Sequence, residues 1–308
     1  MDCRQEGAAL FDGFKKIADG LYLEGLAFDP VRNVIWYSDV IAGGIHGVRT
    51  DGSAFTTINR ARKWTGGILM NADGSILSSG AGGIQWDDPD SGVGGWLLDT
   101  IDGEPVNGVN EMIPDCAGGL FFGTVDLEQI EKGEQTRPSA IYRLTQDRRV
   151  LLAADGLGFT NGMMLSADRR RLFYNDTFDA TYAFDVGPDL TLSNRQPLLR
   201  QDDCDGMALD ADGNLWITGY RSSSLTRIAL DGGPHASFAT PAGAITQIRF
   251  GGPDMRDCYI TSVPRDSGDN LAVGALPEKN QSILYQLRSR VAGLPIAPTC
   301  FALGGGPA

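Results

Sequence analysis

The stretch from Cys204 to Gly232 constrains the fold most strongly, because its features recur along the chain at a near-constant interval. It begins with an acid, Asp205, before a glycine, and continues with three apolar runs separated by tight turn signals such as Asp212-Gly213. Apolar runs bounded by Asp-Gly pairs predict strands joined by tight turns. The stretch therefore reads as three strands and two short connections.

Five related units hold another residue at the position of Asp205, namely Glu24, Gly66, Asn110, Asn161 and Thr246. Successive positions are separated by 42, 44, 51, 44 and 41 residues. A period of about 40 to 50 residues with several strands in each unit is typical of a β-propeller. The sequence predicts an all-β fold: a six-bladed β-propeller of four-stranded antiparallel blades that takes up residues 1–308 as a single domain.

Both ends of the chain contain a short apolar segment. Phe14–Ile17 is expected to form a strand that completes the last blade and closes the ring. Pro298–Leu303 is expected to form one more strand.

Charge and cysteine content exclude several function classes. The formal net charge of −13 would repel phosphate backbones and anionic lipids, so nucleic acids and membranes are excluded as partners, and a neutral small molecule or a bound cation fits better. The N-terminal segment lacks the features of a signal peptide, and no apolar run approaches about 18 residues. The five scattered cysteines contain no C-x-x-C pair and are expected to be reduced. We expect a cytoplasmic protein.

Equivalent positions in a propeller are related by the rotation of the ring, so residues that begin the innermost strands converge on the central channel. Glu24, Asn110, Asn161 and Asp205 should therefore meet at one end of it. Their oxygen ligands, two of them carboxylates, suit a hard divalent cation, and the two carboxylates would repel each other without one. We expect Ca²⁺ first, with Mg²⁺, Mn²⁺ or Zn²⁺ as alternatives. For each residue alone a turn-forming role is the simpler interpretation, but four in register favour a metal site.

The sequence gives little support for other known catalytic motifs. The chain contains two histidines and no G-x-S-x-G, H-E-x-x-H or P-loop motif. Asp210-Ala-Asp212-Gly213 matches the start of a calcium loop, but its position between two strands favours a turn.

At these residues the chain resembles the family of senescence marker protein (regucalcin), gluconolactonase and luciferin-regenerating enzyme. The resemblance implies a six-bladed propeller with one divalent cation at the channel mouth, and it implies lactone hydrolysis. Carried over by position, Glu24, Asn161 and Asp205 are the metal ligands, Asn110 is a further ligand or substrate contact, and Asp205 is also the general base. The matching motifs are Glu24-Gly25 with Trp36-Tyr-Ser-Asp39, Asn110 with Asp115 and Gly123-Thr124, Asn161-Gly162, and Asp205-Gly206 with Gly213-Asn-Leu-Trp216.

The chain departs from the sugar-lactone members of this family in its substrate contacts. Those members place an arginine two positions before the motif asparagine, where this chain has Gly108. The polar insertion Val125–Ser139 is a candidate pocket wall, and Glu128 within it falls where the family can have another substrate-contacting acid. Glu128 or Arg137 could still bind sugar hydroxyls from another direction.

We therefore expect a divalent-metal-dependent lactone hydrolase that prefers less polar or aryl lactones to sugar lactones. A hydrolase of organophosphates or other activated esters, and a non-catalytic metal-binding propeller, are the alternatives.

Overall fold

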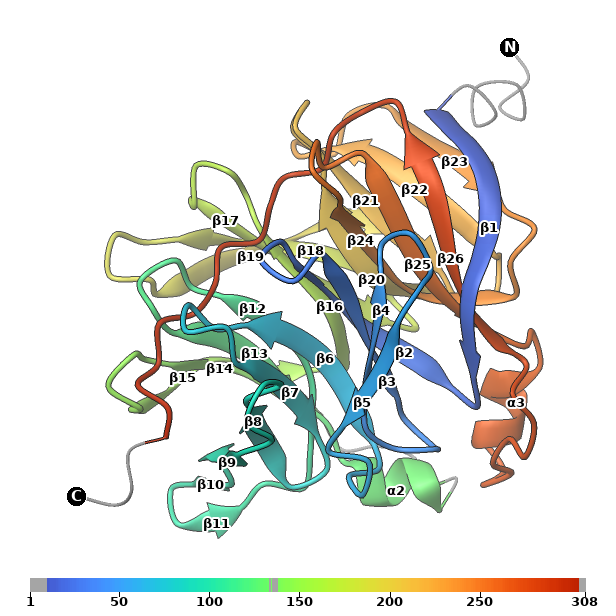
Figure 1. Ribbon diagram of the computed structural model, residues 1–308. Coiled ribbons are helices and arrows are strands. Elements are labelled where there is room, and N and C mark those ends of the chain that lie inside the picture. The colour runs from blue at the N-terminus through green and yellow to red at the C-terminus, as the bar shows by residue number, and fades with distance from the viewer. Residues whose placement is uncertain (1–9, 133, 135–137, 305–308) are drawn as a thin grey trace.

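Six antiparallel four-stranded sheets form a closed ring in the computed structural model of the chain (Figure 1). The structure describes residues 10–132, 134 and 138–304. The innermost strands of neighbouring sheets contact each other all the way round the ring. Each sheet is one blade, and the predicted six-bladed β-propeller is confirmed.

The strands of each blade follow the chain from the central channel outward, apart from the last blade. Blades 1 to 3 consist of β2 (Leu23–Asp29), β3 (Val34–Asp39), β4 (Ile45–Arg49) and β5 (Phe55–Ile58); β6 (Thr65–Met70), β7 (Ile76–Gly80), β8 (Gly83–Asp87) and β9 (Gly94–Leu98); and β12 (Val109–Pro114), β13 (Leu120–Thr124), β14 (Ser139–Leu144) and β15 (Val150–Leu157). Blades 4 to 6 consist of β16 (Phe159–Leu165), β17 (Arg171–Thr177), β18 (Ala180–Val186) and β19 (Leu192–Arg200); β20 (Cys204–Leu209), β21 (Asn214–Gly219), β22 (Ser224–Ala229) and β23 (His235–Ala239); and β24 (Ala244–Gly251), β25 (Asp257–Val263), β26 (Ser282–Ser289) and β1 (Phe11–Gly20).

Two short strands and two short helices of the described chain lie outside the blades. β10 (Thr100–Ile101) and β11 (Glu104–Pro105) form a small hairpin between blades 2 and 3. In Figure 1 the helix α2 (Leu127–Glu131) lies at the lower edge and the helix α3 (Ser267–Leu271) at the right edge. In the described part of the chain, no helix is long and apolar enough to cross a membrane.

The ring is closed by the first strand of the chain. β1 pairs antiparallel with β26, from Phe11 opposite Ser289 to Gly20 opposite Ser282. The predicted closing strand is thus present and longer than the Phe14–Ile17 segment that indicated it. Because β1 is the outermost strand of the last blade, residues from both ends of the chain share one sheet.

Tight turns join the first and second strands of the blades. Gly74 and Gly213 lie in two of these turns with φ of 88° and 79°, a conformation that glycine adopts without a steric penalty. Asp210 accepts a hydrogen bond from the Asn214 backbone amide at 2.8 Å and another from the Trp216 indole at 2.9 Å. Both carboxylate oxygens are therefore occupied within the protein, and the interpretation of Asp210-Ala-Asp212-Gly213 as a turn is confirmed.

The core lies between the blades. Trp36 and Trp216 are among the largest side chains that are completely buried, and one apolar cluster runs from Phe121 in blade 3 through Phe173 in blade 4 to Leu215 in blade 5. Neighbouring blades are held together mainly by their packed faces, since the strand-to-strand backbone pairing stays within each sheet.

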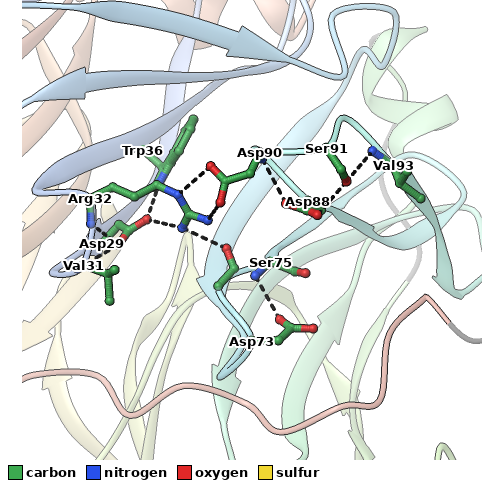
Figure 2. A network of polar contacts seen from close by, with 11 residues as sticks. Asp29, Val31, Arg32, Trp36, Asp73, Ser75, Asp88, Asp90, Ser91 and Val93 are labelled. Carbon is green, nitrogen blue, oxygen red and sulfur yellow. Dashed lines mark hydrogen bonds and ion pairs between the residues drawn. The ribbon is translucent and has the colours of Figure 1, made fainter.

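A polar network reinforces the contact between blades 1 and 2 (Figure 2). Arg32 donates to Asp29 at 2.8 Å and to the carbonyl of Gly74 at 3.1 Å, and it also pairs with Asp90. Trp36 donates to the same Asp29 carboxylate at 3.4 Å. Asp29 ends the inner strand β2, so this network lies at the end of the blades away from Glu24.

The predicted C-terminal strand at Pro298–Leu303 is wrong. The segment crosses the ends of several blades: the Leu294 amide donates to Leu209, the Thr299 amide to Met70, and the Cys300 amide to Gly118. Successive residues thus bond to blades 5, 2 and 3, which leaves no single partner strand, and Thr299 forms only an isolated bridge. Phe301 is 3% exposed and anchors the segment between the blades.

Candidate functional site

Glu24, Asn110, Asn161 and Asp205 line one cavity of about 860 Å³ at the start of the inner strands. They come from blades 1, 3, 4 and 5, so only the ring brings them together. Gly66, the equivalent residue of blade 2, lines the same cavity. Thr246, the equivalent residue of blade 6, is completely buried and donates to the carbonyl of Leu23 at 2.8 Å.

A β-bulge in every inner strand directs these side chains into the channel. A bulge inserts an extra residue, bends the strand and re-aims the side chain. The position found by the sequence repeat falls within the bulge each time. The register shifts lie between Leu23 and Leu26, Thr65 and Ile68, Val109 and Met112, Thr160 and Met163, Cys204 and Met207, and Ile245 and Gln247.

Small polar side chains on the second strands fix the bulges. In four blades such a side chain donates a hydrogen bond to the backbone carbonyl of the key residue in the next blade. The pairs are Ser38 to Gly66 at 2.8 Å, Ser79 to Asn110 at 2.6 Å, Asn175 to Asp205 at 2.6 Å and Thr261 to Glu24 at 2.8 Å. Sequence reasoning missed these residues, although each follows its own repeat position by 13 to 15 residues.

The residues that follow the key positions lie in the channel but are not among the described residues that line the cavity. Four of these six residues are glycines, and the other two are Glu111 and Gln247. The Gln247 amide donates to the Glu111 carboxylate at 2.6 Å across the channel, and both side chains are almost completely buried. A Cβ atom at Gly67 would clash with Glu111, and one at Gly206 would clash with Gln247. The two polar side chains therefore occupy the space that the glycines leave free.

Both asparagines turn their amide nitrogens toward the protein. Asn110 Nδ2 donates to the Thr160 carbonyl at 2.9 Å, and Asn161 Nδ2 donates to Thr177 Oγ1 at 3.3 Å. Their oxygens accept no hydrogen bond from the described residues, so two oxygen ligands remain available in the cavity.

Asp205 is buried, Glu24 is half-buried, and neither carboxylate forms an ion pair with a cation of the described protein. Asp205 is 3% exposed, and its Oδ1 has no hydrogen-bond partner among the described residues. Burial raises the pKa of Glu24 to about 8, with a further contribution from the charge of Glu111. Burial, followed by the charges of Glu24 and Glu111, raises the pKa of Asp205 well above its usual range. A divalent cation would remove this penalty, because it stabilises the ionised form of both groups.

The oxygen-only donor set and the unpaired Asp205 Oδ1 fit such a cation. The described residues contain no cluster of three or more His, Cys, Asp or Glu side chains placed to bind a metal. This is consistent with a set in which two of the four donors are amides.

Two tyrosines beside the carboxylates were not found by sequence reasoning. Tyr22 and Tyr220 line the cavity, and their hydroxyls are 2.8 Å apart. Burial raises the pKa of both phenols, and the nearby charges of Glu24 and Asp205 raise it further, so both are neutral hydrogen-bond donors. Tyr22 lies two residues before Glu24, the repeat position that Gly108 holds before Asn110, so this spacing could have indicated it.

Gly108 is buried beneath the insertion. A Cβ atom there would lie 2.7 Å from Cδ1 of Leu127, which is the first residue of α2. Leu127, Ile130, Glu134 and Pro138 line the cavity, so part of the Val125–Ser139 insertion forms one of its walls. An apolar side chain thus covers the residue where sugar-lactone members would place an arginine.

Glu128 points away from the cavity. Its side chain is 67% exposed, forms an ion pair with Lys132 at 2.6 Å, and is absent from the described cavity lining. The structure therefore does not bring Glu128 to the other candidate residues. Arg137 lies outside the described residues.

Comparisons with known proteins identify relatives in sequence and in fold. A pentonolactonase of Haloferax volcanii is 26% identical over 262 residues, which cover 81% of this chain and 84% of the relative. A regucalcin of Xenopus laevis is 29% identical over 206 residues, which cover 63% and 67%. The crystal structure of a calcium-binding regucalcin from Agrobacterium tumefaciens is similar with a TM-score of 0.78 and 20% identity, and covers 94% of this chain and 97% of that one. The family model described as the SMP-30/Gluconolactonase/LRE-like region matches residues 23–264, so the chain belongs to this family.

Proposed function

We propose that the protein is a divalent-metal-dependent lactone hydrolase. The observation that carries the proposal is a buried, unpaired Asp205 oxygen in a cavity that also receives Glu24, Asn110 and Asn161. Membership of a family that contains lactonases supports the reaction class. The donor set supports Ca²⁺ first, with Mg²⁺, Mn²⁺ or Zn²⁺ as alternatives.

Glu24, Asn161 and Asp205 would hold the cation, with Asn110 as a further ligand or substrate contact. A bound cation at this place supplies Lewis-acid polarisation of an ester carbonyl. Asp205 orients the attacking water and accepts its proton, which is the work of a general base. The neutral hydroxyls of Tyr22 and Tyr220 share one hydrogen bond, so the hydroxyl that accepts it can donate its own proton to a substrate oxygen in the same cavity.

The proposed substrates are less polar or aryl lactones. Leu127 covers Gly108, and most of the remaining wall is apolar or aromatic, including Trp64, Leu157 and Phe159. A site strongly prefers substrates with hydroxyl groups only where buried polar side chains form hydrogen bonds with those hydroxyls. The apolar side chain at this position supports substrates without a polyhydroxy chain.

A substrate panel tests the proposal. Sugar δ-lactones, an aryl lactone such as dihydrocoumarin, and activated phosphoesters are assayed with each metal and with a chelator. We expect hydrolysis of the lactones that is lost with chelator and restored by added Ca²⁺, with the aryl lactone turned over at least as efficiently as the sugar lactone. Turnover of phosphoesters alone would instead identify an organophosphate hydrolase, and metal binding without any turnover would identify a non-catalytic propeller. A preference for the sugar lactone above about a hundredfold would contradict the substrate assignment.

We also propose a cytoplasmic location. Cys116, Cys204, Cys258 and Cys300 are free thiols, which supports a reducing compartment.

A further inference from the structure

Three neighbouring side chains of the cavity form a cluster whose members are exposed or half-buried. Phe159, Phe178 and Arg221 all line the cavity, and this set is called the rim cluster below. The two phenyl rings are 6.1 Å apart with an edge-to-face orientation, and the Arg221 guanidinium lies 5.9 Å from the centre of the Phe178 ring.

Phe178 is solvent-exposed and has an unfavourable backbone conformation. It is 65% exposed, and its φ of 82° is a conformation that side-chain-bearing residues rarely adopt. Its amide donates to the Asp202 carbonyl at 2.9 Å, which fixes the backbone there. A strained residue held against solvent beside a cavity indicates a binding role rather than a packing role.

Arg221 is the single cationic side chain among the described residues that line the cavity. Its backbone amide donates to Asp203 at 2.9 Å, whereas its guanidinium has no ion pair or hydrogen bond with the described residues. The neighbouring acid Asp179 already pairs with Arg200 at 2.6 Å. The guanidinium is therefore free to bind an anion, in a fork geometry that matches a carboxylate.

The cavity is larger than a simple lactone needs. Its volume of about 860 Å³ lies in the upper part of the range of about 300–1,000 Å³ that accommodates drug-sized ligands. A lactone ring at Glu24 and Asp205 would leave room for a substituent that reaches the rim cluster.

We infer that the rim cluster is a second subsite, which binds an aromatic substituent carrying a negative charge on the substrate. This inference rests on the proposed function. The phenyl rings offer an edge and a face to an aromatic ring, and Arg221 pairs with the anionic group. Because Glu134 and Asp269 also line the cavity, an anion is accepted there only through Arg221.

The test compares three lactones that differ only in one substituent: methyl, phenyl or 4-carboxyphenyl. For the unsubstituted protein we expect kcat/KM to rise about fivefold from methyl to phenyl and about fivefold again from phenyl to carboxyphenyl, with the second step weakening at high salt. Arg221→Gln should bring the carboxyphenyl-to-phenyl ratio to one or below, because the acidic residues then repel the substrate. Phe178→Ala should reduce the phenyl-to-methyl ratio. Arg149→Gln, which removes the same charge from a residue outside the cavity lining, should leave both ratios unchanged.

Binding of the matching lactams, which are not hydrolysed, separates this inference from the proposed function. If no lactone is turned over but the carboxyphenyl lactam binds in calorimetry with an affinity that Arg221→Gln reduces, the subsite stands and the reaction is wrong. If the lactones are hydrolysed but the carboxylate has no effect in either protein, the subsite is wrong. Equal losses for all three substrates in Arg221→Gln would also overturn it, because they would indicate a purely structural role.

Discussion

The environment of Asp205 is unfavourable for a charged side chain. This residue is almost completely buried, and one of its oxygens lacks a partner in the described protein. A buried charge without a partner is costly, so such a residue is kept for what it binds rather than for stability. Glu24 is half-buried in the same cavity, and desolvation raises its pKa to about 8.

The first prediction concerns these two carboxylates. Asp205→Ala and Glu24→Gln should reduce turnover by about 10² to 10⁴-fold, since a general base or a metal ligand is lost. Added Ca²⁺ should raise the melting temperature of the unsubstituted protein, and this rise should vanish in both variants. Asp155→Ala, which removes an exposed carboxylate, is the control for a general effect of charge. Near-native turnover in both folded variants would show that the site is placed wrongly.

Sequence alone located the four candidate oxygen donors, because the repeat places them at equivalent positions. It could not reveal the hydrogen bond between Glu111 and Gln247, since these residues replace glycines that have no side chain to compare. Nor could it reveal the apolar cover over Gly108. That cover comes from Leu127 in the insertion, which belongs to no repeat.

At the scale of elements, the second strand of four of the blades supports the first strand of the next blade. Asn175 on β17 illustrates this, because it donates to the backbone carbonyl of Asp205 at 2.6 Å and accepts a hydrogen bond from Thr181 at 2.6 Å. The bulge at Asp205 therefore depends on a side chain from another sheet.

The second prediction tests this support. Asn175→Ala leaves a buried carbonyl without its donor and should lower the free energy of unfolding by about 1–3 kcal/mol. Because the Asp205 backbone loses its anchor, Ca²⁺ affinity should fall as well. Asn280→Ala, at an exposed position, should change neither quantity. Unchanged Ca²⁺ affinity in Asn175→Ala would show that the bulge holds its shape without this bond.

The third prediction uses the contact between Gly108 and α2. Gly108→Arg should destabilise the protein by about 1–3 kcal/mol, because its side chain would collide with Leu127. Adding Leu127→Ala removes the obstruction, so the double variant should recover part of the stability and hydrolyse sugar lactones better relative to dihydrocoumarin. Thermal melts and kcat/KM ratios for all four proteins of the cycle measure both effects. Additive losses of stability would show that the two positions do not compete for space.

At the scale of the whole molecule, the two ends of the channel differ in structure. The candidate site lies at the start of the inner strands, whereas the segment from Leu294 to Phe301 crosses their far ends. The repeat predicted the ring and its closing strand, because both follow from periodicity. It did not predict the path of this segment, which depends on carbonyl groups of three blades that become neighbours only after the ring has formed.

The fourth prediction separates the two ends. Phe301→Ala should lower the free energy of unfolding by about 3–5 kcal/mol, because a buried aromatic side chain is removed from between the blades. Its kcat/KM should stay near that of the unsubstituted protein at temperatures where the variant is folded. Phe55→Ala, the same change at a residue that is 61% exposed, should cost far less. A loss of kcat/KM in folded Phe301→Ala would show that the two ends of the channel are coupled.

The pairing of β1 with β26 also sets the order of events on the ribosome. Residues Gly20 and Ser282 face each other in the last blade, yet 262 positions separate them in the chain. At a synthesis rate of about 5–20 residues per second, β1 waits roughly 13–52 s for its partner. Throughout that time the nascent ring is open, and β1 has unpaired backbone groups that can pair with another chain. Because the candidate site draws on blades at both sides of the opening, it acquires its final shape only after the last strand has been made.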